Sequence, residues 1–77
     1  MNPKIKASAL KELQGKRPDD LVTLKLRTNT VLGDDEFEKL RAWGGELFYD
    51  NGMLAIVSFP AGRVNEVAEW EKVLEII

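Results

Sequence analysis

Residues 46–59 read ELFYDNGMLAIVSF and place two apolar segments on either side of Asn51-Gly52. Both segments are rich in the aliphatic and aromatic side chains that favour strands. Asn and Gly tolerate a positive φ at both central positions of a tight turn, which makes this pair a strong hairpin signal. The sequence therefore predicts two hairpin strands, at residues 46–50 and 53–59.

The sequence before this hairpin predicts a strand followed by a helix. Residues 21–27 alternate between apolar and polar side chains, as a half-buried strand does. Three acidic residues at 34–36 lie where a helix N-terminus stabilises negative charge, and Gly44-Gly45 suit a left-handed exit from that helix.

The sequence after the hairpin predicts a second helix and leaves the last segment open. Pro60 and Gly62 end the second hairpin strand, and the apolar residues within 63–70 follow helical spacing. Residues 72–77 fit either a continuation of this helix or a final short strand, which their β-branched content favours.

The N-terminal segment reads as an extension of the main domain. Residues 8–14 predict a short helix with Ser8 as its cap, and residues 16–20 form a polar, proline-containing linker. We therefore expect an extension at residues 1–20 and one compact α+β domain at residues 21–77.

The element order in residues 21–77 is strand, helix, strand, strand, helix and strand. This order is typical of a ferredoxin-like split βαβ arrangement, in which an antiparallel sheet carries two helices on one face. The chain adds a short N-terminal helical extension to this fold. The opposite face of the sheet is expected to be open.

The composition excludes most enzyme classes. The 77 residues contain no Cys and no His, which removes thiolate and imidazole nucleophiles and thiolate-held zinc. Dense carboxylates occur at 19–20 and 34–36, but neither group has the spacing of a calcium loop. Ser8 and Ser58 have no neighbouring base. We therefore expect no enzyme, no catalytic residue, no metal and no cofactor.

The charge balance and the hydropathy argue against nucleic acid and membrane partners. The net charge of −2 lacks the basic excess that phosphate backbones require. Asn51 stands where an RNA-recognition motif has a basic residue, and Met53 to Ala55 provide none of its stacking rings. No run of roughly 18 apolar residues occurs, and the first residues lack a secretory signal. We expect a cytoplasmic protein.

Strand alternation also predicts which side chains the open face carries. We expect Val57 and Phe59 to point inward, together with Leu47 and Tyr49 of the neighbouring strand. The large apolar side chains that remain for the open face are Phe48, Leu54 and Ile56. Such a face indicates an interface. Two alternatives stay open: a face assignment wrong by one residue, or an N-terminal helix that covers the sheet.

Five segments carry a resemblance to a known family: LVTLKLR at 21–27, GGEL at 44–47, SFP at 58–60, the helical Val64, Val67 and Trp70, and VLEI at 73–76. Together they resemble the propeptide domain of subtilisin-type serine proteases and the small stand-alone inhibitors related to it. The match is one of spacing and apolar pattern.

The resemblance implies a mode of action. Propeptides of this family act as intramolecular chaperones that template the protease and then inhibit it. Their open sheet face packs on two helices of the protease, while the C-terminal tail lies in the active-site cleft. Carried over to this sequence, the partner-binding residues are Lys25, Glu46, Phe48, Leu54, Ile56 and Ser58. Lys25 and Glu46 would set the orientation through charge complementarity.

The sequence also departs from this family. It stops at Ile77 without a tail, no protease domain or secretion signal accompanies it, and residues 1–20 are additional. Met1 favours a stand-alone relative over an excised fragment. We expect a non-enzymatic interaction domain, a protease inhibitor or chaperone-like module that is monomeric in isolation. The alternative is a small self-associating regulatory domain that binds a metabolite at a dimer interface.

Overall fold

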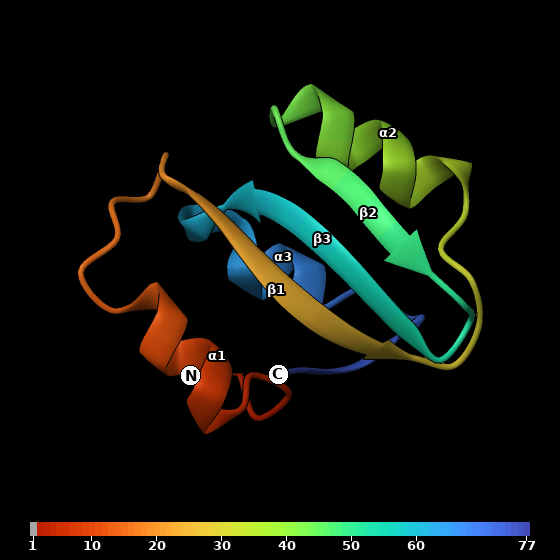
Figure 1. Ribbon diagram of the computed structural model, residues 1–77, viewed down its shortest axis with the longest axis horizontal. Helices are drawn as coiled ribbons and strands as arrows, with labels where there is room; N and C mark the ends of the chain where they lie inside the picture. The colour runs from red at the N-terminus through yellow and green to blue at the C-terminus, as the bar shows by residue number, and fades with distance from the viewer. Residues whose placement is uncertain (1) are drawn as a thin grey trace.

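A four-stranded antiparallel sheet organises the computed structural model, which describes residues 2–77 (Figure 1). The strands are β1 (Leu21–Thr28), β2 (Glu46–Asp50), β3 (Leu54–Pro60) and β4 (Val73–Ile76). Their order across the sheet is β2-β3-β1-β4. The longest pairing joins β1 to β3, so the two longest strands form the centre of the sheet.

The described residues also form three α-helices and one 3₁₀ turn. These are α1 (Ala7–Leu13), α2 (Asp34–Ala42), η1 (Ala61–Arg63) and α3 (Val64–Ala68). Helix α2 connects β1 to β2, and α3 connects β3 to β4. Because all neighbouring strands are antiparallel, each of these connections joins two parallel strands that have one other strand between them. The result is a small α+β fold.

The core lies between the sheet and its helices. Strand β1 alternates between exposed and buried side chains along its whole length, as its sequence predicts. Val57 and Phe59 of β3 are fully buried, which confirms their predicted inward orientation. Leu40 of α2 and Val67 of α3 close the core from the helix side. In Figure 1, α3 lies behind β1 and β3, and no helix lies in front of them.

The β2–β3 hairpin forms where predicted, but its turn differs in detail. Gly52 has a φ of 86°, while no non-glycine residue among residues 2–77 has a positive φ, so Asn51 does not adopt the left-handed conformation. The Asn51 side chain stabilises the turn instead, because its Oδ1 accepts hydrogen bonds from the N–H groups of Met53 and Leu54 at 2.9 and 2.8 Å. Side-chain acceptors therefore replace a second left-handed residue.

The structure defines where α1 begins and which conformation residues 73–76 adopt. Helix α1 begins at Ala7 with Lys6 before it and makes no side-chain cap hydrogen bond, so the prediction of Ser8 as the cap is wrong. The chain enters the helix from the extended Lys6, two residues before the predicted cap. Residues 73–76 form a strand, because Val73 and Ile76 are fully buried beside β1.

The N-terminal segment packs onto the same core as the rest of the chain. Ile5 forms a parallel bridge with Ile76 of β4, and Ala9 of α1 is fully buried. Leu13 lines a surface hollow together with Ala61 and Gly62, on the helix side of the sheet. Figure 1 shows α1 beside β1, with the N- and C-terminal ends close together. The helix borders the open face at β1, where Ser8 and Glu12 line a surface hollow with Thr23 and Lys25, and it does not cover β2 or β3.

Candidate functional site

The candidate site is the open face, the surface of the sheet that no helix covers. Cross-strand pairs on this face join Thr23 to Ser58, Lys25 to Ile56 and Arg27 to Leu54. Strand β2 extends two of these rows, because Glu46 lies opposite Ser58 and Tyr49 lies opposite Ile56. A row of Lys25, Ile56 and Tyr49 therefore crosses three strands at the centre of the face.

The register brings most of the predicted partner-binding residues together. Lys25, Glu46, Leu54, Ile56 and Ser58 all belong to its outward rows. Ser58 is only 6% exposed, and its Oγ accepts a hydrogen bond from the Glu46 N–H at 2.9 Å. Ser58 thus holds β2 against β3, and the other four side chains form the accessible surface.

A β-bulge in β2 changes which aromatic side chains reach this surface. Leu47 pairs with Val57 and Tyr49 with the next residue of β3, Ile56, so Phe48 is an extra residue in the strand. The bulge interrupts the alternation, and Tyr49 is 48% exposed. The prediction that Tyr49 points inward is therefore wrong. Phe48 is exposed as predicted, at 56%.

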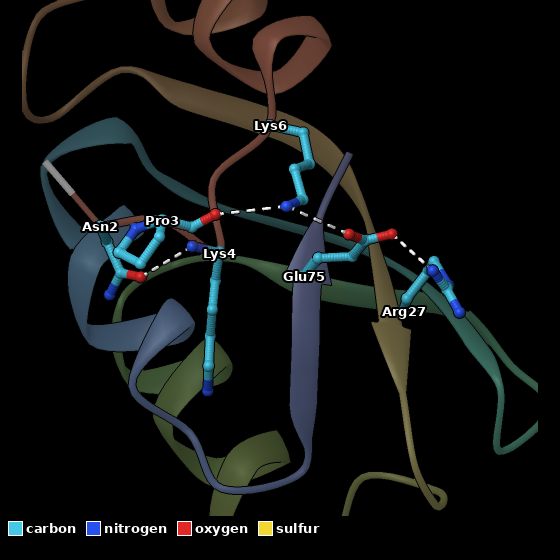
Figure 2. Close-up of polar contacts among 6 residues, drawn as sticks. All are labelled: Asn2, Pro3, Lys4, Lys6, Arg27 and Glu75. Atoms are coloured by element: carbon cyan, nitrogen blue, oxygen red, sulfur yellow. Dashed lines mark hydrogen bonds and ion pairs between the residues drawn. The ribbon is translucent and has the colours of Figure 1, made fainter.

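An ion-pair network that was not predicted from the sequence lies at the β4 side of the open face. The Glu75 carboxylate binds Arg27 Nη1 at 2.6 Å and Lys6 Nζ at 3.6 Å (Figure 2). The hydrogen bond from Arg27 lowers the pKa of Glu75, against the opposing effect of burial, and Lys6 adds to the lowering. These residues are far apart in the sequence, so no local pattern signals the network.

The open face consequently has two chemical halves. The half formed by β1, β4 and the N-terminal segment is basic, because Lys6, Lys25 and Arg27 outnumber Glu75. Within residues 2–77, Lys25 takes part in no ion pair. The half formed by β2 and β3 is mainly apolar, with the side chains of Phe48, Tyr49, Leu54 and Ile56 beside the acidic Glu46.

A second surface hollow, of about 490 Å³, lies between the linker, the end of α2 and η1. Trp43 lines it and stacks on Trp70 with ring centroids 6.1 Å apart. The Arg63 guanidinium lies 5.2 Å from the Trp43 ring centroid and pairs with Glu66 at 2.5 Å. Arg63 already occupies the aromatic face, and its charge is balanced within the chain.

The outer edge of β2 has no strand paired with it within residues 2–77. An open groove of about 360 Å³ lies beside it, lined by Phe37, Arg41, Gly44, Gly45, Glu46 and Leu47. An antiparallel pairing of two β2 strands centred on Phe48 would place Glu46 opposite Asp50 of the second copy. Like charges directly opposite each other destabilise a sheet. The edge is therefore poorly suited to self-pairing in this register.

Comparison with protein-family models, curated proteins and solved structures finds no match to this chain. Across residues 2–77, no group of three or more Asp and Glu side chains could hold a metal ion. No helix in the same part of the chain has the length and apolar character needed to cross a bilayer. The functional proposal therefore rests on the geometry and chemistry of the open face.

Proposed function

We propose that this chain is a non-enzymatic protein-interaction domain of ferredoxin-like topology, similar to subtilisin-type propeptides, that docks through its open face. The strand order supports this topology, since each helical connection passes over one intervening strand. The observation that carries the function is the row of Lys25, Ile56 and Tyr49. It places a cation, an aliphatic side chain and an aromatic side chain on one uncovered surface.

The two halves of the face would contribute differently to binding. Burial of the apolar half would supply most of the affinity, and tyrosine is among the residues that dominate interface energies. Lys25 and Arg27 would steer the encounter and fix the orientation, with Glu46 as an acidic counterpart on the β2 side. A fitting partner surface is apolar at its centre and acidic on the side that meets β1.

The partner in this proposal is a subtilisin-type serine protease, inhibited or assisted in folding in the cytoplasm. Affinity would come from the open face, while Ile77 stays paired with Lys25 of β1. Its N–H donates to the Lys25 carbonyl at 2.8 Å, and its carbonyl accepts from the Lys25 N–H at 3.3 Å.

A titration into a broad-specificity mature subtilisin-type protease tests the proposal, with peptide hydrolysis followed and the protein checked for cleavage. We expect inhibition that Ile56→Asp weakens at least tenfold. Val31→Asp is the matched control, because Val31 is 54% exposed but lies outside the sheet. An absence of inhibition, or an equal loss with Val31→Asp, would remove the protease from the proposal.

The mass of the free protein in solution separates this function from the self-associating alternative. A docking domain that waits for another protein is expected to elute at the mass of a monomer. A stable dimer of the unaltered chain would instead favour a regulatory domain with a site between two copies.

A further inference from the structure

The N-terminal arm, defined as residues 2–13, forms a parallel β-bridge with the outer edge of β4. The Lys6 N–H donates to the Ile76 carbonyl at 2.9 Å, and the Ile76 N–H donates to the Lys4 carbonyl at 2.8 Å. These two hydrogen bonds flank the bridge between Ile5 and Ile76. The arm thus satisfies backbone groups that β4 would otherwise expose at its edge.

Side-chain contacts make the β4 edge selective for the sequence of the arm. Ile5 in the bridge is 7% exposed and Ala9 of α1 is fully buried, so the site takes one aliphatic side chain and, from the following helix, a small one. Lys4 Nζ donates to the Val73 carbonyl at 2.9 Å, and Lys6 Nζ pairs with Glu75. Figure 2 shows both lysines extending from the arm. The β4 edge is therefore specific for an extended Lys-Ile-Lys segment followed by a short helix.

The arm is separable from the rest of the molecule. Residues 14–20 are all exposed, and Gly15 has a φ of 75° with no atom near its missing Cβ. Residues 14–17 make hydrogen bonds only within α1 and the linker, and the first bond to the rest of the domain is at Pro18, whose carbonyl accepts the Gly62 N–H at 2.9 Å. Helix α1 has seven residues and no side-chain cap bond, too short to persist alone in water. Docking on the edge therefore holds the arm in place, and residues 14–17 act as its hinge.

We propose that the outer edge of β4 is an exchangeable acceptor site, and that the arm of a second copy of this chain can occupy it. Every contact that the arm makes within its own chain would be repeated between the two copies. Exchange of an identical element needs no new surface, and only the hinge changes its path. This dimer is distinct from the proposed function, because the β4 edge is not the apolar half of the open face.

Deletion of residues 15–17 tests the exchange, since a shortened hinge prevents the arm from reaching its own β4 edge. We expect the deletion variant to elute at twice the monomer mass while the unaltered chain remains a monomer. Adding Ile5→Asp to the deletion should return the mass to that of a monomer. A deletion variant that stays monomeric, or a dimer that survives Ile5→Asp, would overturn the proposal.

A peptide of residues 2–15 provides a second measurement without any change to the hinge. The labelled peptide is titrated into the full-length Ile5→Asp chain, whose fold is checked by circular dichroism, and fluorescence anisotropy is followed. We expect saturable binding, at least tenfold weaker to the unaltered chain, because its own arm competes at a high effective concentration. Equal binding of a peptide that carries Ile5→Asp would contradict the site.

Discussion

Lys25 and Ile56 are directly opposed on the open face, where the β1–β3 ladder places a cation beside an aliphatic side chain. The next residue of β3, Val57, points to the other side of the sheet and is fully buried. Adjacent residues of one strand therefore separate the proposed docking surface from the core, which allows the two to be altered independently.

The first prediction compares these neighbours. Ile56→Asp should lower the free energy of unfolding by about 1–2 kcal/mol, since it changes strand propensity on an uncovered face. Val57→Asp should cost about 4 kcal/mol or more, because it buries an unpaired charge. Urea unfolding followed by circular dichroism measures both. Equal damage would show that the two faces have been assigned the wrong way round.

The second prediction uses two phenylalanines of the same sheet. Phe59 is fully buried, so Phe59→Ala should cost about 3–5 kcal/mol through lost burial and the cavity left behind. Phe48→Ala should change the free energy of unfolding by less than about 1 kcal/mol, because the ring is already exposed. The same variant should nevertheless weaken docking, which the protease titration detects.

The third prediction concerns the glycine pair before β2. A Cβ on Gly45 would lie 2.0 Å from the Ser58 carbonyl oxygen, whereas a Cβ on Gly44 would meet no atom within 4 Å. Gly44→Ala should therefore cost only about 1 kcal/mol, from its φ of 83°. Gly45→Ala should cost about 2–3 kcal/mol as β2 is forced away from β3. Thermal melting of the two variants tests the order, and a larger loss at Gly44 would contradict it.

The fourth prediction concerns acid stability. Burial opposes the ionisation of Glu36, but hydrogen bonds from Lys72 at 2.8 Å and from the Gly33 N–H at 2.6 Å outweigh it, so the pKa of Glu36 lies below its ordinary 4.5. The unfolded chain therefore binds the proton more readily than the folded chain. The stabilisation by this carboxylate is present above about pH 4.5 and is lost as the pH falls through the folded pKa.

Melting temperatures between pH 3 and 6 check this expectation against the Glu36→Gln variant. The unaltered protein should lose stability faster than the variant as the pH decreases below about 4.5. Parallel curves for the two proteins would show that Glu36 does not contribute to the acid sensitivity. Glu38→Gln is a suitable control, because Glu38 takes part in no ion pair within residues 2–77.

Much of the sheet could be predicted because its signals are local. The alternation within residues 21–27 follows from the two-residue period of a strand, and the hairpin follows from the chemistry of Asn51-Gly52. The bulge at Phe48 has no such signal, because it arises from how β2 fits against β3. Its consequence, the exposure of Tyr49, was therefore missed.

The parts of the candidate site that the sequence did not reveal depend on long-range pairing. Glu75 meets Lys6 and Arg27 only after the N-terminal arm and β4 have been placed beside β1. The choice of a strand for residues 73–76 depends on the same partners, since the spacing of the apolar residues fits either a helix or a strand and only the β-branched content favours the strand. Tertiary contacts determine whether such a segment forms a strand or a helix.

The bridge between Ile5 and Ile76 also constrains when the molecule can fold. It connects residues that are far apart in the sequence, and β1 likewise pairs with β4 only when residues 73–76 are present. During translation, the N-terminal arm and the β4 side of β1 therefore remain unpaired until residue 76 has left the ribosome. Contacts of such large sequence separation slow folding, so we expect the β4 side of the sheet to form late.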